Sequence, residues 1–154
     1  MSLKHLKEKI YGHCHSYILQ RIETALQAIA SVEAAGEEET KSSAGDKYET
    51  SREMMKQELE RHQQLLAGAR EMERTLEGLR PTVQNSSATI VPGSLIRTDQ
   101  GLLYLAVGIG KLSVEGQDIF VLSPSAPVGK LLFGKQAGDR ISFNTKSYHI
   151  LEIG

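Results

Sequence analysis

The stretch that decides the fold is Gly36-Glu37-Glu38-Glu39-Thr40-Lys41-Ser42-Ser43-Ala44-Gly45-Asp46-Lys47-Tyr48-Glu49-Thr50. It is polar and acidic, and its five carboxylates and two lysines give it a local charge of −3. Helix-compatible sequence flanks it for about thirty residues on either side, with no proline between residues 1 and 80. Two helices joined by a short connection fold back on each other as an antiparallel hairpin. We therefore expect residues 36–50 to form the tip of such a hairpin.

Apolar side chains recur at steps of three and four on both sides of this segment, as expected for helices with one buried face. The first stripe comprises Leu3, Leu6, Ile10, Cys14, Ile18, Ile22, Ala25, Ile29 and Val32. The second comprises Met55, Leu59, His62, Leu66, Ala69, Met72, Leu76 and Leu79. Gly36 is expected to cap the end of the first helix, and Pro81 to stop the second. The sequence thus predicts an antiparallel coiled-coil hairpin over residues 1–80.

The period of the apolar residues changes after a polar linker at residues 81–87. Alternating, β-branched-rich segments predict strands at residues 94–98, 102–107, 111–114, 117–122, 139–143 and 148–153. Between the fourth and fifth of these, residues 125–133 fit a short helix with a proline near its start. The fold class is therefore α+β: the hairpin is followed, over residues 88–154, by a small antiparallel sheet domain with one short helix.

Composition excludes several classes of protein. The chain has no Trp, only 5% aromatic residues and a net charge of −1, which argues against a base-stacking platform or broad nonspecific binding to nucleic acid. Cys14 is the single cysteine, so no internal disulfide can form. The N-terminal residues lack the apolar run of a signal peptide, and no stretch is long enough to span a bilayer. We expect a cytoplasmic protein with no membrane partner, monomeric or weakly oligomeric.

Two short motifs have competing interpretations. Asp46 and Glu49 have the spacing of a capping box, in which the first residue caps the second helix and the other returns a hydrogen bond. The same spacing allows two carboxylates to converge on one ion. His13-Cys14-His15 invites a metal site, but successive helical residues point about 100° apart, so a structural role is the better interpretation. Glu37-Glu38-Glu39 is interpreted as a solvated loop, with an electrostatic supporting role as the alternative.

The order of these segments resembles that of the bacterial Gre transcript-cleavage factors. The C-terminal stretch Ser123-Pro124-Ser125-Ala126-Pro127-Val128-Gly129-Lys130-Leu131-Leu132-Phe133-Gly134-Lys135-Gln136-Ala137-Gly138-Asp139 is similar to that family's Ser-Pro, short apolar helix, Gly-Lys and Gly-Asp pattern. Tyr148-His149-Ile150-Leu151-Glu152-Ile153 resembles its terminal strand. The resemblance implies an FKBP-like domain that docks on RNA polymerase and is not expected to isomerise proline.

At the predicted tip, Gly45-Asp46-Lys47-Tyr48-Glu49 resembles the family's Gly-Asp-x-x-Glu motif, which maps its functional pair onto Asp46 and Glu49. The resemblance implies that the hairpin enters the secondary channel of a backtracked RNA polymerase, close to the transcript RNA. There the two carboxylates help hold a second Mg²⁺, jointly with the polymerase, which then cleaves the RNA. The protein would stimulate a nuclease rather than be an enzyme, and no cofactor is expected in the isolated chain.

Two alternatives remain at this stage. After Glu49 the chain continues Thr50-Ser51-Arg52-Glu53, where the family usually continues Asn-Ala-Glu-Tyr. This difference motivates a regulator that occupies the secondary channel without promoting cleavage. An isolated hairpin also has an exposed seam, which motivates a coiled-coil adaptor that pairs with another chain.

Overall fold

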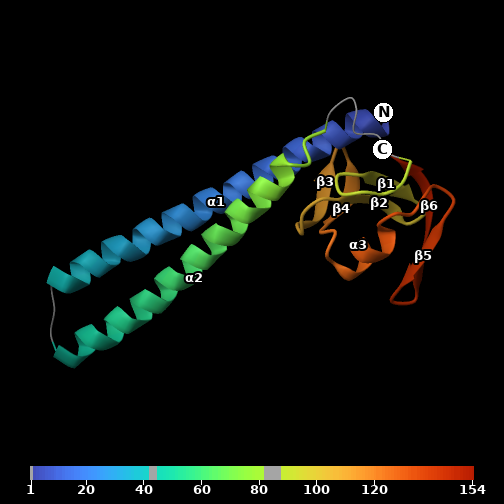
Figure 1. Cartoon of the computed structure of the whole chain (residues 1–154). Helices are drawn as coiled ribbons and strands as arrows, with labels where there is room; N and C mark the ends of the chain where they lie inside the picture. Colours follow the sequence, from blue (N-terminus) through green and yellow to red (C-terminus); the bar gives the residue numbers. More distant parts are fainter. Residues whose placement is uncertain (1, 42–44, 82–87) are drawn as a thin grey trace. The chain divides into compact units, whose positions relative to one another are not determined.

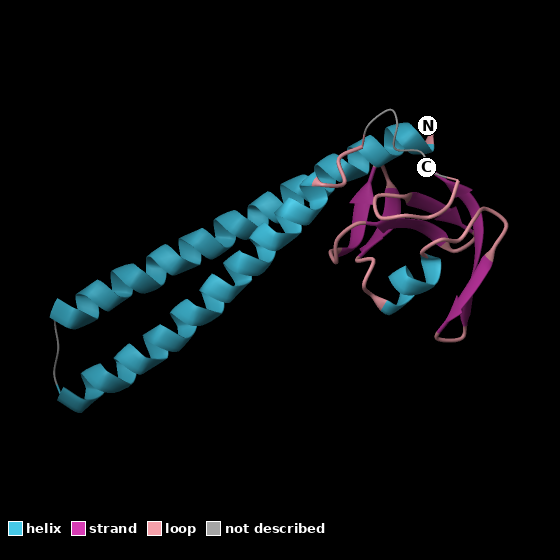
Figure 2. Ribbon diagram, viewed as in Figure 1, coloured by secondary structure: helices cyan, strands magenta, loops and turns pink. Residues whose placement is uncertain are grey.

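The computed structural model describes residues 2–41, 45–81 and 88–154, with only the backbone given for residues 39–41 and 45–49. The element order is two long helices, four strands, a short helix and two strands (Figures 1 and 2). The α+β prediction is confirmed. Contacts divide the chain into two compact units, one made of residues 1–15 and 74–154 and the other of residues 16–73.

The unit of residues 16–73 is an antiparallel pair of helices, formed by most of α1 (Leu3–Lys41) and α2 (Gly45–Glu77) (Figure 1). Its buried residues are Ile18, Ala25 and Ala69, and the other predicted seam positions from Ile22 to Val32 and from Met55 to Met72 are half-buried. The periodicity therefore identified the correct face of each helix. With a single seam to bury, these helices derive their stability from that face rather than from a closed core.

The end of the first helix differs from the prediction. α1 continues to Lys41, so Gly36 lies inside the helix and Glu37 and Glu38 are exposed helical residues, not a loop. Glu39 is also helical, although its side chain lies outside the description. The helix continues because glycine can end a helix but does not have to. Residues 37–40 also include no proline or glycine that would break it.

The other unit contains a six-stranded sheet in the order β3-β4-β2-β1-β6-β5. Its strands are β1 (Leu95–Thr98), β2 (Gly101–Leu105), β3 (Gly110–Val114), β4 (Gln117–Leu122), β5 (Arg140–Phe143) and β6 (Lys146–Ile153). All six predicted strands are confirmed. The sheet is mixed rather than wholly antiparallel, because β4 pairs in parallel with β2 while the β3–β4 hairpin folds outward.

The sheet and the short helix α3 (Pro127–Leu132) enclose the core of this unit. Eight side chains form it: Ile90, Ile96, Leu103, Leu105, Leu122, Leu132, Ile141 and Ile150, with Val128 packed against them. Proline begins α3, as predicted. The helix approaches the preceding chain closely at Gly129, where a Cβ would clash with the carbonyl oxygen of Ser123. Only glycine fits that position.

The first turns of α1 belong to the same unit as the sheet. Leu3, Leu6, Ile10 and Cys14 are all buried. Lys9 forms an ion pair of 3.0 Å with Glu115, in the β3–β4 turn, and Lys7 donates a hydrogen bond of 3.4 Å to the carbonyl oxygen of Gly154. The N-terminal stripe therefore packs within the unit that holds the sheet.

Candidate functional site

The predicted tip residues Asp46 and Glu49 lie at the start of α2. The helix begins at Gly45, so Asp46 is inside its first turn rather than at the capping position before it. The side chains of both residues lie outside the description. The backbone places positions 46 and 49, which are three residues apart, on the same face of α2.

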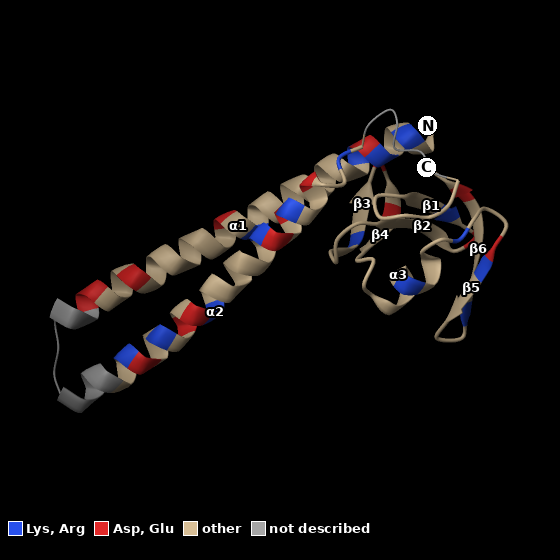
Figure 3. Ribbon diagram, viewed as in Figure 1, with Lys and Arg blue, Asp and Glu red and all other residues tan. Residues whose placement is uncertain are grey.

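Charge is distributed unevenly over the two long helices (Figure 3). Between Ile22 and Thr40, α1 contains five glutamates and neither Lys nor Arg. α2 instead mixes both signs: Arg52, Lys56, Arg61, Arg70 and Arg74 alternate with glutamates. The half of α1 that leads to the tip is therefore acidic, which is compatible with an approach to a bound cation.

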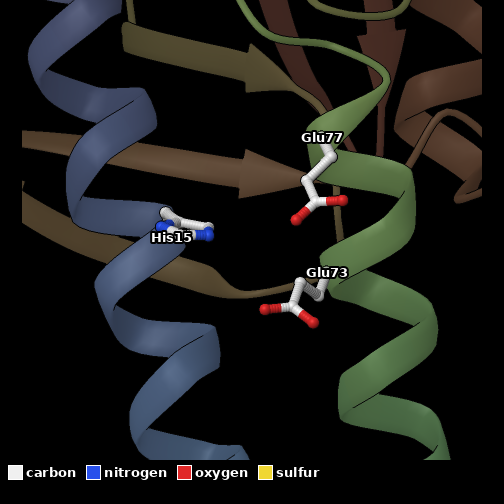
Figure 4. Close-up of side chains that lie close together, drawn as sticks. All are labelled: His15, Glu73 and Glu77. Carbon is white, nitrogen blue, oxygen red and sulfur yellow. The ribbon is translucent and has the colours of Figure 1, made fainter.

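A second group of possible ligands was not predicted. The ligand atoms of His15, Glu73 and Glu77 all lie within 4.8 Å of one another (Figure 4). His15 and Glu77 belong to the same compact unit, and Glu73 precedes Glu77 by one turn of the unbroken helix α2. His15 and Glu73 are half-buried, and Glu77 is exposed.

Sequence reasoning rejected His15 as a ligand because it considered only its neighbours His13 and Cys14. That reasoning holds for the tripeptide, since His13 is exposed while Cys14 is fully buried. The partners of His15 come from α2 instead. The signal that could have found them is the Glu73–Glu77 spacing of four, combined with the antiparallel register of the two stripes.

The sheet itself carries a pocket of about 570 Å³. Its walls include the exposed aromatic ring of Phe120 and the ring of Tyr148, with the Lys146 ammonium 5.8 Å from the Tyr148 ring centroid. Lys111 also lines it and forms an ion pair of 3.4 Å with Asp118 on the neighbouring strand. A pocket lined mainly by apolar side chains with a few charged groups is typical of a ligand-binding surface.

Comparison with known proteins adds little to this picture. No family description matches the sequence, and no curated protein matches it. Among solved structures, the chain is similar to one described as the transcription factor Gfh1, with 16% identity, a TM-score of 0.34, and coverage of 90% of this chain and 92% of that one. A likeness this remote carries no argument about function.

Among the described residues, none of the helices has an apolar stretch that could span a membrane.

Proposed function

We propose that this protein is a Gre-like transcription elongation factor that binds RNA polymerase and stimulates cleavage of backtracked RNA. The observation that carries the proposal is an antiparallel pair of helices of 39 and 33 residues whose connecting end bears the Gly-Asp-x-x-Glu motif. At about 1.5 Å per residue, helices of this length reach roughly 50 Å. That is long enough to carry a carboxylate pair deep into a channel of a large enzyme.

Asp46 and Glu49 have the donor chemistry that Mg²⁺ requires. Mg²⁺ prefers oxygen ligands and is commonly held by one or two carboxylates together with waters and substrate phosphates. A second Mg²⁺ supplies activation of the attacking water and stabilisation of the leaving oxygen. Asp46 and Glu49 would complete its coordination only together with the polymerase. Two carboxylates fill only some of the positions of an octahedral ion, and the other positions need other ligands.

The sheet unit is proposed as the docking module of the same protein. The resemblance implies an FKBP-like docking domain in this part of the chain, and the pocket on the sheet is lined by the exposed ring of Phe120 and the half-buried ring of Tyr148. The pocket is suited to binding a protein surface, since aromatic side chains with polar edges are enriched at such interfaces.

The experiment that tests this function is a transcript-cleavage assay on stalled, backtracked complexes with the matching polymerase. The variant Asp46→Asn/Glu49→Gln removes both charges and keeps the side-chain shapes. Both positions are in the first turns of α2, where acids gain about 0.3–1 kcal/mol each from the helix dipole, so the loss of stability is small. We expect retained polymerase binding and a cleavage rate reduced to that of polymerase alone.

A matched control is Glu37→Gln/Glu38→Gln, which removes two exposed charges from α1 in the same half of the hairpin. It should preserve most of the cleavage activity if the Asp46–Glu49 pair is specific. Equal losses in the two double variants would contradict that specificity and leave only a general acidic effect.

The same assay separates the other two candidate functions. Wild-type protein that binds polymerase and inhibits transcription without cleavage would indicate the non-cleaving regulator, which the sequence Thr50-Ser51-Arg52-Glu53 after the pair favours. A purified polymerase that captures none of the wild-type protein would favour the coiled-coil adaptor.

A further inference from the structure

We propose that His15, Glu73 and Glu77 form a binding site for a divalent transition-metal ion of the Zn²⁺ class. It is separate from the Asp46–Glu49 pair and does not depend on the proposed function. The ligand atoms of the three side chains lie within 4.8 Å of one another. In Figure 4 the imidazole of His15 on α1 faces the carboxylates of Glu73 and Glu77 on α2.

The spacing of the atoms is close to what a metal needs. An ion with bonds of ~2.1 Å and tetrahedral geometry holds its ligand atoms ~3.4 Å apart. The three atoms must therefore move inward by about an ångström, within the reach of glutamate rotamers, whose three torsions are adjustable. Helix continuity aligns Glu73 with Glu77, since residues four apart lie one above the other on the same face.

The ligand types select the ion. Imidazole nitrogen and carboxylate oxygen are both ligand types that Zn²⁺ uses in proteins, and imidazole also suits other first-row transition metals. Mg²⁺ binds imidazole poorly because it prefers oxygen in a strict octahedron. Three protein ligands leave the fourth position of a tetrahedral ion to water.

The surroundings of His15 favour a fixed ligand. Its ring stacks on Tyr11, one turn earlier in α1, with the ring planes 6° apart and the centroids separated by 6.4 Å. A stacked ring has fewer orientations to lose when a metal binds, which lowers the entropic cost of binding.

The consequence of binding is a cross-link between His15 on α1 and the two glutamates on α2. A metal that binds the folded protein and not the unfolded chain raises its stability by mass action. The proposed ion thus ties residue 15 to residues 73–77 without any disulfide, in a chain whose one cysteine is buried.

The test is isothermal titration of the chelator-treated full chain with Zn²⁺, followed by thermal unfolding with and without the ion. Wild-type protein should bind Zn²⁺ and unfold at a higher temperature in its presence. His15→Gln and Glu77→Gln should each weaken this binding by about tenfold or more, since each removes one of only three protein ligands. The same titration with Mg²⁺ should give no binding that depends on His15.

Two control variants are available: one removes a different histidine, and the other removes a different histidine–glutamate pair. His13→Gln changes an exposed histidine two residues away on α1. The variant Glu58→Gln/His62→Gln removes a histidine–glutamate pair of 3.7 Å elsewhere on α2. Both controls should bind Zn²⁺ as wild type does, and circular dichroism should show unchanged helix content in every variant.

Two outcomes would overturn the proposal. One is wild-type protein that binds no Zn²⁺ at concentrations where a control metallopeptide does. The other is Zn²⁺ binding that persists unchanged in the His15→Gln variant, which would assign the ion to other carboxylates or histidines. Visible absorption of bound Co²⁺ gives an independent readout, because four-coordinate Co²⁺ absorbs far more strongly than the hydrated ion.

Discussion

Cys14 has a thiol with no access to solvent. The residue is fully buried on α1, and burial raises the pKa of its thiol from the ordinary value of 9.0 to about 12. The hydroxyls of Tyr11 and Tyr104 are buried in the same unit without a protein hydrogen-bond partner, and burial also raises the pKa of Tyr104. Burial therefore favours the neutral thiol, and Cys14 acts as a small apolar residue.

We predict that Cys14 resists alkylation by iodoacetamide at pH 8 in the folded protein and reacts at once after denaturation. The thiolate is the reactive form, and both burial and the raised pKa suppress it. Mass spectrometry of the folded and urea-treated protein measures this directly. Rapid alkylation of Cys14 in the folded protein would contradict the burial of this side chain.

The same pKa fixes the sign of a pH dependence. The folded state favours the neutral thiol, so its contribution to stability is complete below pH 9 and is lost as the pH rises from 9 towards 12. The variant Cys14→Val, which cannot ionise, should show a shallower fall in the free energy of unfolding over this range.

At the scale of single residues, the sequence predicted what depends on local pattern. Cys14 fell on the apolar stripe and is buried there. The partners of His15 could not be predicted from its neighbours, because they lie about sixty positions away on another helix. Pairing between distant residues depends on the register between elements, which no local pattern contains.

At the scale of elements, the end of the first helix was predicted wrongly because glycine is compatible with both the interior and the end of a helix. Gly36 looked like a cap because glycine favours the left-handed conformation that ends helices. It has no positive φ in the structure, and α1 continues for five residues beyond it. A Cβ added at Gly36 would lie 3.8 Å from the sulfur of Met55, which is ordinary contact.

We therefore predict that Gly36→Ala stabilises the protein by about 0.5–1 kcal/mol, the usual difference between glycine and alanine inside a helix. Urea unfolding followed by circular dichroism measures it. Gly68→Ala is the matched control, because Gly68 lies within α2 and an added Cβ there meets nothing within 4 Å. If Gly68→Ala stabilised the protein while Gly36→Ala destabilised it, the first helix would end at Gly36, as the sequence predicted.

The strands show the limit of local patterns more clearly. Alternation located all six, and the Glu115–Gly116 turn has the positive φ angles, 53° and 75°, of a tight hairpin. The parallel pairing of β2 with β4 was missed. Sequential strands usually neighbour each other, but here β3 lies at the edge and β4 takes the place beside β2. That choice depends on burying Ile119 and Val121, which is a property of the whole sheet.

At the scale of the whole molecule, the chain crosses between its two units within its helices. Periodicity predicted one boundary, in the linker at residues 81–87, most of which lies outside the described residues. Contacts instead group residues 1–15 with residues 74–154. The beginning of α1 is therefore expected to share the stability of the sheet, although more than eighty residues of sequence separate them.

Ile10→Ala tests this coupling, because Ile10 is fully buried on α1 in the unit that holds the sheet. Truncating a buried isoleucine usually lowers the free energy of unfolding by about 2–5 kcal/mol. If residues 1–15 and the sheet unfold together, that loss should appear in the slowest-exchanging amides of β2 and β4, measured by native-state hydrogen exchange. Leu19→Ala, nine residues further along α1 at a position 44% exposed, should leave those amides unchanged. Faster exchange confined to α1 in the Ile10→Ala protein would instead mean that the sheet folds without the N-terminal helix, and the hairpin would then be an independent domain along its whole length.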